Sequence, residues 1–96
     1  MYAATTMFTM PSGMREKMEQ LADQMLGGMK QMPGFVSVKF VIDEEANEYG
    51  GFALWETREN AKAAMQQTRA KLDEALAGAV IGPLRRKLFE VYEPKG

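Results

Sequence analysis

The chain has 96 residues, of which 46% are hydrophobic and 26% charged, and its net charge is −1. These values are typical of one globular domain, expected here over residues 1–96, and provide no electrostatic field that attracts nucleic acid. Cysteine and histidine are absent, which excludes disulfides, thiolate or imidazole zinc sites, and Ser-His or Cys-His nucleophiles.

The first third of the chain predicts a strand followed by a helix. Residues 2–9 are rich in β-branched and aromatic side chains, which indicates a strand. Pro11-Ser12-Gly13 interrupts this strand, and Ser12 is expected to cap the helix that follows. That helix is predicted over about residues 14–29, from apolar side chains at helical spacing: Met14, Met18, Leu21, Met25 and Met29. Methionine at this spacing is typical of core packing rather than of a copper site.

The middle of the chain predicts a β-hairpin. Pro33-Gly34 precedes a strand over residues 35–42, whose alternate side chains are expected to face the helices: Val36, Val38, Phe40 and Ile42. The acidic residues 43–48 predict the hairpin loop, and residues 49–55 a third strand. On that strand Phe52 and Leu54 form one face, and the other face carries Tyr49, Gly51, Ala53 and Trp55.

The last third predicts a second helix and a fourth strand. Thr57 is expected to cap a helix that runs to about residue 77, before the breaker Gly82-Pro83. A strand is predicted over about residues 86–92.

The resulting β-α-β-β-α-β order predicts an α+β, ferredoxin-like fold with a four-stranded antiparallel sheet and both helices on one face. The open face is then expected to carry many apolar side chains, including Phe35, Val41, Tyr49, Ala53, Trp55 and Tyr92. Because so apolar a surface is unfavourable in water, we expect a homodimer in which two such faces meet.

Three short motifs stand in a characteristic order: Pro11-Ser12-Gly13, Pro33-Gly34-Phe35, and Trp55-Glu56-Thr57 followed by Arg58-Glu59-Asn60-Ala61. In this order the chain resembles the dimeric α+β barrel superfamily, and within it the antibiotic-biosynthesis-monooxygenase-like domains. The resemblance implies a homodimer with a small-molecule cleft in each protomer. It also implies oxygenation of electron-rich aromatic or quinol-type compounds without metal or flavin, so no cofactor and no metal are expected.

Candidate ligand-binding residues follow from this resemblance. Trp55 matches the tryptophan that lines the pocket of both haem-degrading and quinone-forming members, although a large aromatic also seals a strand-to-helix corner. Phe40 is expected beside it, and Arg86, within the basic run 85–87, is expected to contact an anionic group. Haem-degrading members use a histidine, which this chain lacks, and an asparagine on strand one, where Thr5 and Thr6 stand. Haem degradation is therefore not expected, and Thr5 is the fourth candidate.

Catalytic residues are not assigned from the sequence. Tyr49, Tyr92 and Asp43 become candidate acids or bases if they are buried.

Two other function classes share this element order. The first is a ligand-binding or structural dimer without turnover. The second is an RNA-binding module, because Gly51-Phe52-Ala53 is similar to part of its third-strand motif. Leu54 and Thr57 stand where that motif has aromatics, so no nucleic-acid partner is expected. No apolar run is long enough to span a membrane and no signal peptide is visible, which favours a cytoplasmic location and no membrane partner.

Overall fold

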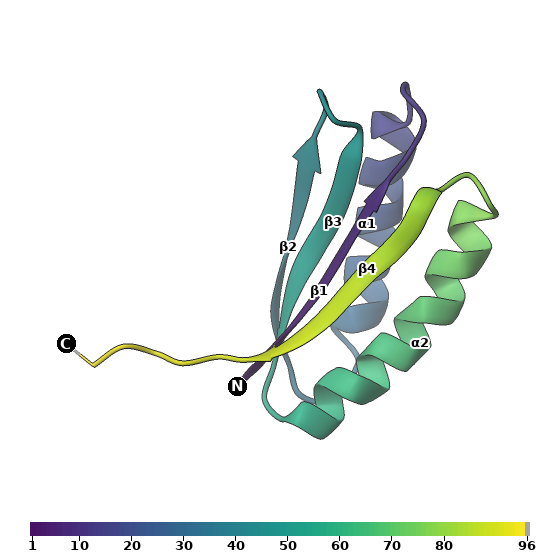
Figure 1. Cartoon of the computed structure of the whole chain (residues 1–96). Coiled ribbons are helices and arrows are strands. Elements are labelled where there is room, and N and C mark those ends of the chain that lie inside the picture. Colours follow the sequence, from purple (N-terminus) through teal and green to yellow (C-terminus); the bar gives the residue numbers. More distant parts are fainter. Residues whose placement is uncertain (96) are drawn as a thin grey trace.

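The computed structural model describes residues 1–95 and shows a four-stranded sheet with two helices on one of its faces (Figure 1). All neighbouring strands pair antiparallel, in the order β2-β3-β1-β4. The predicted α+β ferredoxin-like fold is therefore confirmed. The elements run in chain order as β1 (Tyr2–Thr9), α1 (Arg15–Met29), β2 (Phe35–Asp43), β3 (Glu48–Trp55), α2 (Arg58–Leu76) and β4 (Ile81–Glu90).

The two helices begin differently. Thr57 caps α2 as predicted, because its Oγ1 accepts a hydrogen bond from the backbone N–H of Asn60 at 3.0 Å. The predicted Ser12 cap of α1 is wrong. That helix begins at Arg15, and Met14 occupies the cap position without a side-chain hydrogen bond. Its first turn therefore depends on tertiary packing rather than on a capping side chain.

The fourth strand is longer than predicted at its start. It begins at Ile81, not near residue 86, and ends at Glu90. The sequence reading treated Gly82-Pro83 only as a breaker. Because β4 is an edge strand, Pro83 can lie within it without removing a hydrogen bond from a central ladder. The pairing with β1 is irregular between Met7 and Thr9.

Two of the sequence motifs meet where β2 and α2 begin. The Phe35 ring packs edge-on against the Trp55 indole, with ring centroids 5.6 Å apart. The backbone N–H of Glu56 donates to the carbonyl of Gly34 at 2.8 Å. Gly34 has a φ of +78°, and a Cβ there would overlap the side chain of Asn60. This contact explains why glycine stands before Phe35.

The face of β3 that the helices cover was assigned incorrectly from the sequence. Trp55, Tyr49 and Ala53 are buried beneath the helices, not on the open face. Phe35 also packs against this core. Phe35 lies on the covered face because β2 contains a bulge: Phe35 pairs with Trp55, whereas Ser37 pairs with the next residue of β3, Leu54. The extra residue, Val36, places Phe35 on the same face as the correctly assigned Val38.

The open face of the sheet still carries apolar side chains, but different ones. They alternate with the buried set, and we call them the open-face patch: Met7, Phe52, Leu54 and Phe89. Phe52 and Phe89 are 45% and 48% exposed. Beyond β4 the chain extends away from the sheet (Figure 1), and Tyr92 is exposed there. Within residues 1–95, no helix has the length and apolar character needed to cross a membrane.

Candidate functional site

A cavity of about 300 Å³ lies between the helices and the covered face of the sheet. The sheet contributes its floor from all four strands, including Ala4, Gly51 and Ala53. The helices contribute a ceiling that is largely methionine: Met18, Met25, Met29 and Met65. This volume is at the lower end of the roughly 300–1,000 Å³ of ligand pockets. The walls are predominantly apolar, as such pockets require.

The cavity opens to solvent between α1 and the edge strand β2. Its exposed lining residues all lie there: Glu19 and Asp23 on α1, and Phe40 and Ile42 on β2. Glu19 and Asp23 are one helical turn apart, so both carboxylates lie on the same side of the mouth. A ligand therefore enters between an acidic rim and two apolar side chains.

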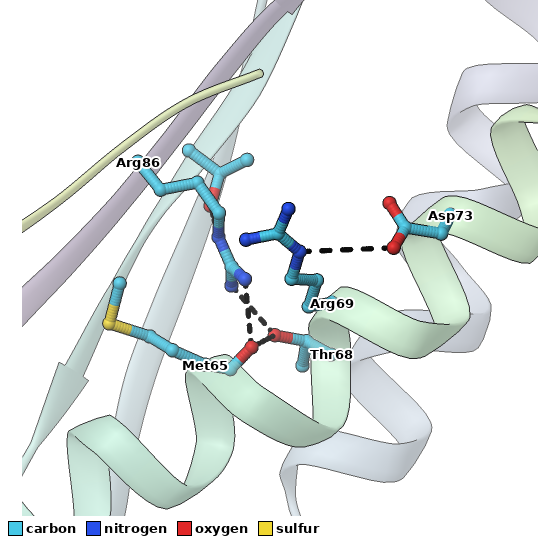
Figure 2. Close-up of polar contacts among 6 residues, drawn as sticks. Met65, Thr68, Arg69, Asp73 and Arg86 are labelled. Atoms are coloured by element: carbon cyan, nitrogen blue, oxygen red, sulfur yellow. Dashed lines mark hydrogen bonds and ion pairs between the residues drawn. The ribbon is translucent and has the colours of Figure 1, made fainter. Parts of the chain in front are cut away.

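Arg86 lies across the sheet from this mouth, on the opposite edge strand. Figure 2 shows its guanidinium pointing at the backbone of α2. Nη1 donates to the carbonyl oxygen of Met65 at 2.7 Å, and Nη2 donates to Oγ1 of Thr68 at 2.9 Å. Nε donates to Oγ1 of Thr6 at 3.2 Å. All three acceptors are neutral, so these contacts orient the cation without neutralising it.

The charge of Arg86 is consequently uncompensated by a direct partner. Within the described part of the chain, no carboxylate forms an ion pair with it. Burial lowers the pKa of Arg86 below its ordinary value, the positive charge of Arg69 lowers it further, and Asp73 raises it. Arg69 and Asp73 lie beside each other on α2 (Figure 2). The site therefore presents a positive charge that lacks an anion.

Trp55 contributes a second unpaired polar group. Its side chain lines the cavity and is almost completely buried. Its indole Nε1–H finds no acceptor among residues 1–95. Because an unpaired buried donor is costly, an acceptor on a bound ligand would relieve this cost.

The structure brings together three of the four residues predicted to bind ligand. Trp55, Phe40 and Arg86 all line the cavity. Thr5 does not, because it alternates with Thr6 along β1 and lies on the open face of the sheet. Thr6 is the strand-one hydroxyl that faces the helices.

Of the three candidate acids and bases, one lines the cavity and two are exposed away from it. Tyr49 is buried and lines the cavity. Asp43 is exposed in the hairpin turn, where it accepts a hydrogen bond from the backbone of Ala46. Tyr92 is exposed beyond β4. Only Tyr49 is therefore placed to touch a ligand in the cavity.

Thr68 is a functional candidate that the sequence reading missed. It is buried on α2, donates to the carbonyl oxygen of Ala64 at 2.8 Å, and accepts from Arg86. A signal was available: Thr68 lies between Ala64 and Leu72 at helical spacing, so it is a polar residue within an apolar stripe.

Across residues 1–95, no three carboxylates gather closely enough to hold a metal ion. The acidic hairpin is a turn in which Asn47 has a φ of 53°.

Comparison with solved structures shows the same fold in proteins of low sequence identity. A "putative antibiotic biosynthesis monooxygenase" from Deinococcus radiodurans superposes with a TM-score of 0.81 at 13% identity, covering 100% of this chain and 97% of that one. SnoaB, described as a cofactor-independent oxygenase from Streptomyces nogalater, has a TM-score of 0.75 at 19% identity, with 97% and 94% covered. The monooxygenase ActVA-Orf6 of Streptomyces coelicolor, in complex with the ligand nanaomycin D, has a TM-score of 0.77 at 19% identity, with 98% and 89% covered.

The sequence itself matches a family model. No curated protein matches the chain. The model described as "Putative mono-oxygenase ydhR" covers residues 5–96, which is nearly the whole sequence. It begins within β1 and includes the other three strands and both helices. The chain therefore belongs to the ydhR mono-oxygenase family.

Proposed function

We propose that this chain binds a small planar phenol or quinol and oxygenates it with dioxygen, without a metal or an organic cofactor. The observation that carries the proposal is Arg86, a half-buried cation without a carboxylate partner in residues 1–95, at the inner end of an apolar cavity. Apolar walls with one fixed charge suit an apolar ring that bears an acidic hydroxyl. A nearby positive charge also lowers the pKa of such a hydroxyl and favours the phenolate.

The reaction needs only the substrate and dioxygen. Ionisation of a phenol places negative charge on ring carbons, and one of these carbons gives its electron pair to dioxygen, forming a C–O bond and a peroxide. Loss of the proton from that carbon and cleavage of the O–O bond leave a second carbonyl and release water. For naphthol the balance is naphthol plus dioxygen to naphthoquinone plus water. Dioxygen is the only oxidant, and no external reductant is consumed.

The residues of the cavity would have separate tasks in this reaction. Arg86 would hold the phenolate oxygen and fix the ring that lies beside it. The free Nε1–H of Trp55 would donate to an oxygen that gains charge as the peroxide forms. The methionine ceiling and the aromatic rings would exclude water from the reacting carbon.

Structural neighbours support this assignment at the level of the fold. SnoaB is described as a cofactor-independent oxygenase, and ActVA-Orf6 as a monooxygenase with a bound ligand. The family of this chain carries a mono-oxygenase description as well. A ligand-binding dimer without turnover has the same fold, and oxygen uptake distinguishes the two.

The test is an assay of oxygen consumption with naphthol in air-saturated buffer containing a chelator. We expect uptake of one dioxygen per naphthol, formation of naphthoquinone, and one labelled oxygen atom in the quinone when isotopically labelled dioxygen is supplied. Saturable naphthol binding with no uptake above the rate without protein would reject oxygenation and leave a ligand-binding protein.

We also propose that the chain is a homodimer that buries the open-face patch. Phe52 and Phe89 are both about half exposed on the uncovered face of the sheet, and together with Met7 and Leu54 they form an apolar surface. A second copy presents the same apolar surface and would exclude water from both. Two sheets meeting in this way would form the predicted dimeric barrel.

Light scattering tests the dimer. We expect a dimer for the natural chain and a monomer for Phe52→Lys, because the substitution places a charge in the centre of the buried patch. Ala70→Lys is the control: Ala70 is exposed on α2, which covers the other face of the sheet. A natural chain that stays monomeric at high concentration would rule out the dimer.

A further inference from the structure

Four residues form one row across the whole sheet, and each comes from a different strand. Phe40 on β2 pairs with Gly51 on β3, Gly51 pairs with Thr6 on β1, and Thr6 pairs with Arg86 on β4. All four line the cavity. Because neighbouring strands are about 4.8 Å apart, the row spans roughly 14 Å from the mouth to the inner cation.

The floor beside this row is also flat. The neighbouring position on the covered face carries Ala53 on β3, paired with Ala4 on β1. Large aromatic pairs bound this stretch at both ends: Phe35 packs on Trp55 at one end, and Phe8 stacks on Tyr49 at the other, with ring centroids 6.4 Å apart. Glycine, alanine and threonine between aromatic ends leave a shallow slot on the sheet surface.

Gly51 lies in the centre of that slot, and its backbone conformation does not require glycine. Its φ is not positive, unlike that of Gly34. A Cβ at Gly51 would stand 3.2 Å from the Phe40 ring and 3.2 Å from the carbonyl oxygen of Lys39. Phe40 is 39% exposed at the mouth and can move aside. Alanine or valine at position 51 would therefore require the Phe40 ring and the Lys39 carbonyl to shift by a few tenths of an ångström, and would occupy space in the cavity.

The ceiling opposite this slot is adaptable. Met18, Met25, Met29 and Met65 face it from the two helices, and unbranched thioether side chains adjust to the thickness of what they cover. A cavity with a rigid sheet on one side and adaptable methionine side chains on the other selects ligands by their flatness and their extent along the sheet. The shape of the ligand surface that faces the methionines matters less.

From these observations we propose that Gly51 determines ligand specificity: it admits a planar, fused-ring phenol that lies flat along the row, with its hydroxyl at Arg86 and its far ring at Phe40. This inference rests on the proposed binding of phenols in the cavity. The length of the row suits about two or three fused rings. A puckered ring of similar size would meet the floor at Gly51.

Titration calorimetry with naphthol and tetrahydronaphthol, in which one ring is saturated and puckered, tests the slot on the natural chain. We expect naphthol to bind about tenfold more tightly, the smallest effect typical of a misfitting group in an apolar pocket. Equal affinities for the two compounds would overturn the proposal. This comparison uses only the natural chain, so the test can be made even if a substitution in β3 prevents folding.

Variants at Gly51 provide the second test. Gly51→Ala should weaken naphthol binding, and Gly51→Val should weaken it by about tenfold or more, because the added methyl groups fill the slot. Gly27→Ala is the matched control, since a Cβ at Gly27 meets no atom within 4 Å, and its naphthol affinity should not change. Circular dichroism establishes that each variant is folded. A folded Gly51→Val that binds naphthol like the natural chain would overturn the proposal.

These outcomes separate the slot from the proposed reaction. Planar selectivity that depends on Gly51, without oxygen uptake, would reject oxygenation and retain the slot. Oxygen uptake with the same dependence on naphthol concentration in Gly51→Val as in the natural chain would reject the slot and retain oxygenation. Absence of binding by either compound to the natural chain would reject both.

Discussion

Replacing Arg86 with glutamine should separate ligand binding from folding. The guanidinium has five N–H donors, and three of them are used by Met65, Thr68 and Thr6, which leaves two for a ligand. A hydrogen bond to a charged group contributes about 1.5–3 kcal/mol. Arg86→Gln should therefore weaken the binding of a phenolate by about tenfold to hundredfold.

The stability of the fold should change much less. The lowered pKa of Arg86 means that the folded protein disfavours its positive charge. That cost is present at every pH below the pKa of the folded state. Removing the charge therefore increases the free energy of unfolding at neutral pH. The loss of three hydrogen bonds opposes this gain. Because the two effects oppose each other, we expect the free energy of unfolding to change less than the free energy of ligand binding.

The assay is titration calorimetry with naphthol across the pH range in which naphthol ionises, combined with thermal unfolding. Arginine stays protonated throughout this range, so affinity for the natural chain should rise with pH as the phenolate forms. Arg86→Gln should lose most of that rise. Arg85→Gln is the matched control, because Arg85 is exposed and forms an ion pair with Glu48 instead. The reasoning is refuted if Arg86→Gln keeps both the natural affinity and its pH dependence.

Three further substitutions test the packing around the site. Trp55→Phe should weaken naphthol binding about twofold to tenfold by removing the unpaired N–H, as seen by calorimetry; an unchanged affinity would show that Nε1 donates to no ligand. Thr57→Ala should lower the melting temperature by about 4–8 °C through loss of the α2 cap, and no shift would mean that the hydrogen bond to Asn60 is not stabilising. Ala77→Gly should raise stability by about 1 kcal/mol in denaturant unfolding, because Ala77 has a φ of 40°; a loss of stability would contradict this argument.

The sequence was sufficient for the element order but not for the faces of the sheet. Alternation along residues 49–55 separates Tyr49 and Trp55 from Phe52 correctly. Both sets are apolar, however, so hydrophobicity alone cannot decide which set the helices cover. The bulge at Val36 then reverses the phase between Phe35 and the rest of β2, and such a bulge has no reliable mark in one sequence.

The sequence was sufficient to choose some residues of the candidate site but not all of them. Trp55 and Arg86 stand out as the only tryptophan and as part of a basic run, and both line the cavity. Thr5 and Thr6 differ only in the face to which their hydroxyls point, and strand phase, which the sequence does not fix, places Thr6 on the cavity side. Gly51 could not be recognised from the sequence, since a glycine that leaves space in a floor resembles any other glycine in a strand.

The methionine ceiling has a consequence for the lifetime of the protein under the proposed chemistry. A ring-bound peroxide whose O–O bond does not break to form the second carbonyl could instead give its outer oxygen atom to a thioether of the cavity wall, from Met18, Met25, Met29 or Met65. Thioethers are readily converted to sulfoxides, which are polar and unsuited to an apolar wall. Each abortive cycle would therefore damage the cavity before the rest of the core. Inactivation would accumulate with turnover rather than with time, and a reductase for methionine sulfoxide would restore the activity.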